Sequence, residues 1–269
     1  MASDHYLDLN KDLWNSKVDV HVKSDFYDQK SFLEGRSSLN SIELDTLGEV
    51  KGQKILHLHC HFGQDSLSLA RMGAEVTGTD FSAEALAVAR ETNTKLGMDA
   101  HFVEADTMNL PKDLLQGEYD WVFATYGVVG WLPDMALMMS QISKALKPGG
   151  RFLLVEFHPV IWMYDDNFTT IKYPYTSPDP IEIIEDGSYT DGDENVSGKT
   201  VSWNHGISQI ITPLISNGLE ILEFVEYDYS PYPCFSHITE RSKGRYVISK
   251  FPEKVPHTYK ICAQKPKRA

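Results

Sequence analysis

Residues 55–63 read Ile-Leu-His-Leu-His-Cys-His-Phe-Gly, and this stretch decides how the whole sequence is interpreted. Its apolar beginning, residues 55–59, predicts a buried strand, and residues 63–72 predict a helix that ends at Gly73. A buried strand that leads through a short turn into a helix is the first unit of an α/β sheet. Ligands bind beyond the carboxyl ends of the strands in such sheets, so we expect binding residues at the end of this stretch.

Strands and helices continue to alternate outward from this stretch. Further strands are expected at residues 75–79, 101–104, 120–125, 151–157, 219–227 and 257–263, and helices at residues 9–20, 82–96, 135–145 and 207–215. Ser82 is a suitable N-cap, residues 147–150 (Lys-Pro-Gly-Gly) end a helical pattern, and Pro213 predicts a kink or an early start of its helix. The predicted fold class is α/β, with a mostly parallel sheet of seven strands and helices on both faces.

The alternation also divides the chain into segments. We expect an N-terminal helical lid at residues 1–50, of which residues 26–47 pack over the sheet edge, and a ligand-binding core at residues 51–158. An inserted cap follows at residues 159–204. Residues 205–269 complete the core and contain a second insertion at residues 229–256. The cap segment is rich in Pro, Tyr, Asp and Gly and has little helical period, which is typical of an insertion.

Composition excludes several classes of function. The formal net charge of -13 repels nucleic acid, and no apolar run reaches the roughly twenty residues that span a bilayer. The three cysteines, Cys60, Cys234 and Cys262, form no CxxC pair and are expected to be reduced thiols. We therefore expect a cytoplasmic protein, a monomer or homodimer, that acts on a small molecule and contacts neither nucleic acid nor a membrane.

Polar residues follow the ends of the first three expected strands. The second strand ends at Asp80, about twenty residues beyond the first turn, where an acidic side chain is suited to accept hydrogen bonds from a ribose diol. Phe81 follows it, and the third strand leads into Ala105, Asp106 and Thr107. The first three strand ends are therefore the expected binding site.

These segments resemble the Rossmann-like (class I) SAM-dependent methyltransferase family, whose first motif commonly reads Val-Leu-Asp-Leu-Gly-Cys-Gly-x-Gly. The resemblance continues through residues 76–82, 104–106 and 146–150, and covers roughly residues 14–227. The form Leu-His-Leu-x-Cys-His-Phe-Gly, with Trp-Leu-Pro at 131–133 and Glu-Phe-His-Pro at 156–159, is similar to a bacterial subgroup of uncharacterised small-molecule methyltransferases.

The resemblance implies a three-layer fold, S-adenosyl-L-methionine (SAM) as cofactor and S-adenosyl-L-homocysteine (SAH) as product. Residues 51–158 would be the SAM-binding core, and no metal is required. The implied cofactor-binding residues are His57, His59, Cys60, His61, Gly63, Asp80, Phe81, Ala105, Asp106, Thr107, Thr125 and Tyr126. By position, residues 59–63 would wrap the methionine part, Asp80 would bind the ribose, Phe81 and residues 105–106 would meet the adenine, and residues 125–126 would flank the sulfonium.

Three histidines depart from the family's motif. His57 replaces the usual acid, and His59 and His61 replace two glycines. Because histidine carries a Cβ, we expect these positions to avoid the left-handed backbone that glycine permits. A side chain at His61 would obstruct a pyrophosphate, which argues against a dinucleotide more strongly than against SAM.

The same histidines raise a metal alternative. His57, His59 and His61 would lie on one face if the strand continued that far, and Asp65 would add a carboxylate, so a metal-dependent hydrolase is one rival hypothesis. A buried histidine satisfied by hydrogen bonds is an equally good interpretation of His57. A SAM-binding protein without transferase activity is the second rival.

The expected reaction is transfer of the SAM methyl group to an unidentified small-molecule acceptor by in-line displacement, for which placement supplies most of the rate. A general base is needed only for a protonated nucleophile, and the candidates are Tyr126, His158 and His205. The aromatic residues Trp14, Tyr27, Trp131 and Trp203 could face a sulfonium, with Trp203 favoured as core. Acidic residues of the cap are expected on a solvated face, and would favour a cationic substrate if they lined the cleft.

Overall fold

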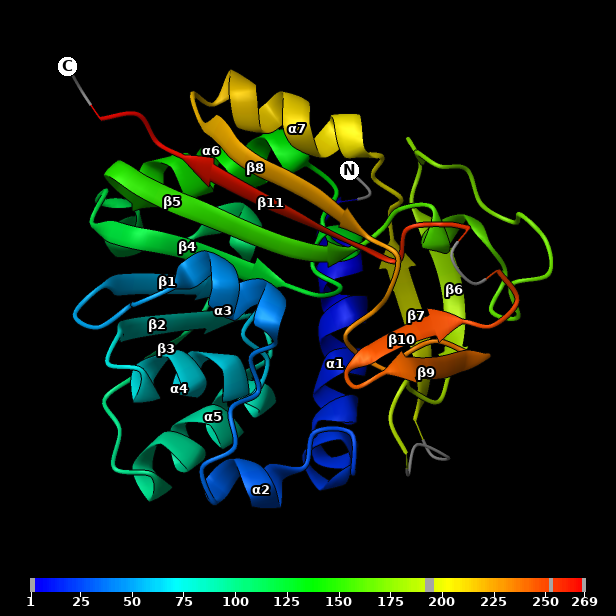
Figure 1. Cartoon of the computed structure of the whole chain (residues 1–269), viewed down its shortest axis with the longest axis horizontal. Coiled ribbons are helices and arrows are strands. Elements are labelled where there is room, and N and C mark those ends of the chain that lie inside the picture. The colour runs from blue at the N-terminus through cyan, green and yellow to red at the C-terminus, as the bar shows by residue number, and fades with distance from the viewer. Residues whose placement is uncertain (1–2, 192–195, 252–253, 268–269) are drawn as a thin grey trace.

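A twisted seven-stranded sheet forms the centre of the computed structural model, which describes residues 3–191, 196–251 and 254–267 (Figure 1). Its strands, in spatial order, are β3 (His101–Glu104), β2 (Glu75–Asp80), β1 (Lys54–Leu58), β4 (Tyr119–Thr125), β5 (Leu146–Phe157), β11 (Thr258–Gln264) and β8 (Glu220–Tyr227). β11 pairs antiparallel with both neighbours, and the pairs from β3 through β5 are all parallel. The predicted mostly parallel sheet of seven strands is confirmed.

Helices cover both faces of this sheet, because alternate strand residues face opposite layers. The main helices are α3 (Ser41–Leu47), α4 (Gln64–Arg71), α5 (Ala83–Lys95), α6 (Met135–Ala145) and α7 (Ile207–Ser216). On β1, Leu56 belongs to a core cluster with residues of α6 and α7, whereas Ile55 belongs to a cluster with residues of α3, α4 and α5. The sheet therefore lies between two helical layers, as expected.

Several element boundaries differ from the sequence predictions. α1 spans Ser3–Lys23, longer at both ends than residues 9–20. β1 ends at Leu58 and does not include His59, and β5 begins directly after α6. Pro213 lies inside α7 without ending it. Short helical turns occur at α2 (Gln29–Leu33), η1 (Thr107–Asn109), η2 (Lys112–Leu115), η3 (Val129–Trp131) and η4 (Ile161–Met163).

The two insertions each fold into a hairpin. The cap segment forms β6 (Ile181–Asp186) and β7 (Ser197–Ser202), and the second insertion forms β9 (Ile238–Ser242) and β10 (Arg245–Ile248), with antiparallel pairing in both. Figure 1 shows α1 standing between the sheet and the β6–β7 hairpin. None of the helices in the described ranges has the length and apolar character needed to cross a membrane.

α1 and the β6–β7 hairpin are joined by specific contacts, and we call them together the lid. Asn10 Nδ2 donates to the Val201 carbonyl at 2.8 Å, and the Val201 N–H donates to Asn10 Oδ1 at 2.9 Å. The buried Lys17 ammonium pairs with Glu185. The N-terminal helix and the inserted cap thus form one unit beside the sheet, which the sequence did not indicate.

Candidate functional site

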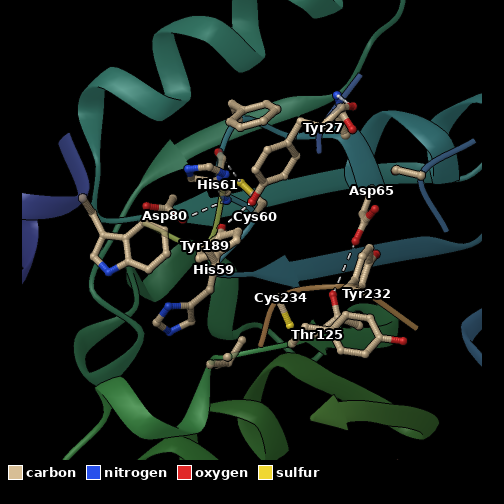
Figure 2. A pocket seen from close by; sticks show the side chains of 18 of the residues that line it. Tyr27, His59, Cys60, His61, Asp65, Asp80, Thr125, Tyr189, Tyr232 and Cys234 are labelled. Carbon is tan, nitrogen blue, oxygen red and sulfur yellow. Dashed lines mark hydrogen bonds between the residues drawn. The ribbon is translucent and has the colours of Figure 1, made fainter. Parts of the chain in front are cut away.

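A cavity of about 280 Å³ lies beyond the carboxyl ends of β1, β2 and β4, between the core and the lid (Figure 2). This volume is near the lower end of the range for small-molecule sites. Residues proposed from the sequence that line it are His57, His59, Cys60, His61, Gly63, Asp80, Phe81, Thr125 and Tyr126. The structure therefore brings most of the implied cofactor residues to one place.

The remaining cofactor candidates lie beside this cavity. Asp106 and Thr107 line a much smaller adjoining pocket together with His59 and Phe81. Asp106 Oδ1 accepts from the Met108 N–H at 2.8 Å. Ala105 lines neither space, and its N–H donates to the Asp80 carbonyl at 2.9 Å.

The loop after β1 adopts a left-handed backbone at alternate residues. The φ angles are 53° at His59, 50° at His61 and 83° at Gly63. The expectation that the histidines avoid this conformation is therefore wrong. Backbone hydrogen bonds fix the loop instead: the Cys60 N–H donates to the Thr79 carbonyl, and the Gly63 N–H donates to the Cys60 carbonyl, both at 2.9 Å. Histidine is also one of the residues that enters the left-handed region more readily than most.

Asp80 connects this loop to the next helix. Its Oδ2 accepts from the His61 N–H at 2.8 Å, and its Oδ1 accepts from the Ser82 N–H at 2.9 Å. Burial raises the pKa of Asp80 to about 6, against the lowering effect of these bonds. Each carboxylate oxygen has a second lone pair, so the side chain can still accept from a ligand in the cavity.

The three motif histidines have separate environments. His57 Nδ1 is 2.8 Å from Ser66 Oγ, and its ring lies against Phe123. Burial lowers the pKa of His57 to about 3 and of His59 to about 4, so both are neutral. Because β1 ends at Leu58, strand alternation does not align the three rings, and no three His, Cys, Asp or Glu side chains in the described part of the chain are grouped to hold a metal.

Only one of the three candidate bases lines the cavity. Tyr126 does so at the end of β4, and burial together with the nearby Glu43 raises its pKa well above the ordinary value. The other two lie outside the lining and use their ring nitrogens in structural contacts. His158 Nε2 is 2.9 Å from Glu226 Oε1, and His205 Nε2 is 2.7 Å from the Leu132 carbonyl oxygen.

Two carboxyl groups in or near the cavity, those of Asp65 and Glu43, were not identified as site residues of a methyltransferase. Asp65, in the first turn of α4, lines the cavity, and Thr125 Oγ1 donates to its Oδ2 at 3.4 Å. Figure 2 shows Asp65 and Asp80 on different sides of the cavity. Glu43 of α3 is fully buried, and burial and the Asp65 charge raise its pKa to about 7. The sequence offered a signal only for Asp65, which follows Gly63 by two residues.

Aromatic side chains make up much of the remaining lining. Trp14, Tyr27 and Trp131 line the cavity as considered from the sequence, whereas Trp203 lies outside the lining and packs against Tyr6. Tyr232 lines the cavity as well, and further lining residues that sequence reasoning missed include Phe26, Phe157, Trp162, Tyr189, Cys234 and Phe235.

The acidic residues of the cap do not reach this cavity within the described ranges, where Asp65 and Asp80 are the carboxylates of the lining. Asp193 and Glu194 of the cap lie outside the described residues. A cationic substrate is therefore not supported by the cap.

Comparison with known proteins finds methyltransferases that are similar to part of this chain. Residues 55–150 match the family described as "Methyltransferase domain". The chain is 33% identical over 132 residues to an uncharacterized methyltransferase of Synechocystis, covering 48% of this chain and 59% of that protein. It is 32% identical over 134 residues to the ubiquinone biosynthesis O-methyltransferase of Erwinia tasmaniensis, covering 48% and 54%. The chain thus spans little more than half the length of these curated relatives.

Solved structures show the same fold. An S-adenosylmethionine-dependent methyltransferase from Clostridium acetobutylicum superposes with a TM-score of 0.60 at 15% identity, covering 96% of this chain and 98% of that one. A second from Mesorhizobium loti gives a TM-score of 0.57 at 22% identity, covering 86% and 99%. The Rossmann-like methyltransferase fold implied by the sequence is confirmed.

Proposed function

We propose that the chain, whose residues 55–150 match a methyltransferase domain, transfers the methyl group of SAM to a small-molecule acceptor. The observation that carries the proposal is the buried Asp80 carboxylate beside the loop of residues 59–63, at the edge of the cavity. A hydrogen-bond acceptor at the end of the second strand is what a nucleoside ribose requires.

The lining residues fit this cofactor. Asp80 would accept hydrogen bonds from the ribose hydroxyls, and Phe81 would lie against the adenine. Asp106 has its Oδ2 left for the adenine amino group, because Oδ1 accepts from the backbone of η1. Four polar atoms on the lining residues Trp14, His59, His61 and Tyr126 are buried without a protein partner in the described ranges, as expected of a wall that meets a polar ligand.

The acceptor occupies the aromatic part of the cavity. Tyr126, Phe157, Trp162, Tyr232 and Phe235 surround this part, which we call the acceptor chamber. SAM, when bound, supplies an activated methyl group. The chain then has to hold the acceptor in line with that methyl group and keep water out.

Asp65 is the carboxyl group best placed to take a proton from the acceptor. It lines the cavity beside Thr125, and burial raises its pKa, so its carboxylate is a stronger base than an exposed one. His158 and His205 are assigned structural roles instead. The aromatic part of the cavity leaves room for a second molecule beside the cofactor residues, which supports a transferase over a protein that only binds SAM.

Calorimetry with SAH tests the cofactor half of this proposal. We expect the parent to bind SAH and Asp80→Ala to bind it at least tenfold more weakly, about 1.4 kcal/mol. Asp113→Ala is the control, because Asp113 is exposed in η2. No binding by the parent at millimolar SAH refutes the proposal. Transfer of a labelled methyl group across a panel of phenols, amines and carboxylic acids tests the acceptor half, and light scattering tests the expected monomer or homodimer.

A further inference from the structure

Backbone strain is concentrated at the cavity. Six non-glycine residues in the described ranges have a positive φ, and His59, His61 and Tyr126 among them line the cavity. A Cβ makes the left-handed conformation less favourable than it is for glycine. Strain of this kind persists where the surrounding structure imposes it, and it gathers at ligand sites. His59 and His61 stand where the family motif has glycine, so this chain retains a backbone strain that the motif avoids.

Unpartnered polar atoms gather at the same place. His59 Nε2, His61 Nε2 and Trp14 Nε1 are buried and make no hydrogen bond within the described ranges, and all three residues line the cavity. Leaving a buried donor or acceptor unsatisfied is costly. The His61 ring centroid lies 5.6 Å from that of Trp14 and 4.4 Å from that of Phe62, so packing holds the ring in place without satisfying its nitrogen.

We propose that the side chains of His59 and His61 bind the nucleoside part of the cofactor through their Nε2 atoms; this inference rests on the proposed methyltransferase function. His61 is assigned to the ribose side, because its own N–H is bonded to Asp80, the ribose acceptor. His59 is assigned to the adenine side, because it lines both the main cavity and the small pocket that contains Phe81 and Asp106.

The protonation state of both rings suits this role. Burial lowers the pKa of His59 to about 4 and that of His61 well below its ordinary value, with the charges of His21 and Lys17 acting in the same direction on His61. Each ring is therefore neutral and offers one donor and one acceptor nitrogen. A neutral ring can bond a hydroxyl or a purine nitrogen and does not repel the cationic sulfonium.

The rival explanation is that the two rings only fill space. Restoring the motif's glycines separates the explanations, because glycine removes the strain together with the imidazole. A space-filling role predicts that His59→Gly and His61→Gly bind SAH as tightly as the parent or more tightly. A ligand role predicts weaker binding even though the backbone has become more favourable.

The chain offers a matched control for the glycine substitution. His237 has the same left-handed backbone, with φ 54°, and is exposed outside the cavity lining. His237→Gly therefore relieves comparable strain without touching the site. His61→Asn is the conservative variant, since asparagine also tolerates the left-handed region and keeps a polar side chain.

The experiment measures SAH and adenosine affinities by calorimetry and the melting temperature of each variant. We expect His59→Gly and His61→Gly each to lose at least tenfold in affinity for both ligands while each variant still melts in a single cooperative transition. His237→Gly should stay within twofold of the parent, and His61→Asn should fall between the parent and His61→Gly. Unchanged affinity in both cavity variants overturns the inference, as does a loss for SAH without one for adenosine. Absence of SAH binding by the parent instead overturns the proposed function.

Discussion

Asp80→Asn should gain stability relative to the parent as the pH rises from acidic to neutral. Asp80 is 7% exposed, and burial raises its pKa from the ordinary 3.8 to about 6. The pKa of Asp80 is higher in the folded state than in the unfolded state. Its contribution to the free energy of unfolding is therefore fully present below about pH 4 and is lost as the pH rises through 6. The gap between the two values corresponds to about 3 kcal/mol of unfolding free energy.

Urea denaturation of parent and variant between pH 4 and pH 8 measures this effect. The asparagine also loses one of the two backbone hydrogen bonds, but that loss is the same at every pH and cancels when the difference is followed across pH. Asp120→Asn is the control with the opposite sign. Although partial burial of Asp120 acts the other way, the Lys147 ammonium and the Lys54 N–H hold its pKa below the ordinary value. A difference between parent and Asp80→Asn that does not change with pH would refute a raised pKa at Asp80.

Two further substitutions test the loop and the lid. Gly63→Ala should destabilise the fold by about 1–3 kcal/mol in urea and weaken SAH binding, because φ is +83° and a Cβ would lie 2.8 Å from Phe102 Cε1. Asn10→Ala should speed hydrogen exchange in β7 and lower the free energy of unfolding by about 1–3 kcal/mol, because the buried N–H and carbonyl of Val201 lose their partner. The control Asp8→Ala, at an exposed position, should have neither effect. Equal exchange in the two variants would contradict the contact between α1 and β7.

The sheet and its ligand-binding edge could be predicted because their signals are local. The central strands β1 and β4 are short stretches rich in apolar residues, and the neighbouring strand β2 ends on a chemically distinctive residue, Asp80. Parallel strands with crossover helices bring those ends to one edge, so neighbours along the chain become neighbours in space. Asp80 and residues 59–63 meet for this reason alone.

An N-terminal helical lid was predicted, but its pairing with the β6–β7 hairpin could not be, because the partners are remote in sequence. Asn10 and Val201 lie 191 residues apart, and neither residue type signals the other. The walls of the acceptor chamber also come from separate parts of the chain: Tyr126 follows β4, Phe157 ends β5, and Phe235 lies in the second insertion. Aromatic residues are common in cores, so their convergence here is visible only once the insertions are placed.

The left-handed histidines show where a local rule fails for a physical reason. The rule weighs the Cβ cost at His59 and His61 in isolation, whereas the loop is fixed by the bonds of Cys60 to Thr79, of Gly63 to Cys60 and of His61 to Asp80. An extended backbone at these positions would break that set, and unmade buried hydrogen bonds cost as much as the strain or more. The loop conformation is therefore stabilised by backbone hydrogen bonds and does not require glycine at positions 59 and 61. Both positions can hold a histidine whose imidazole lines the cavity.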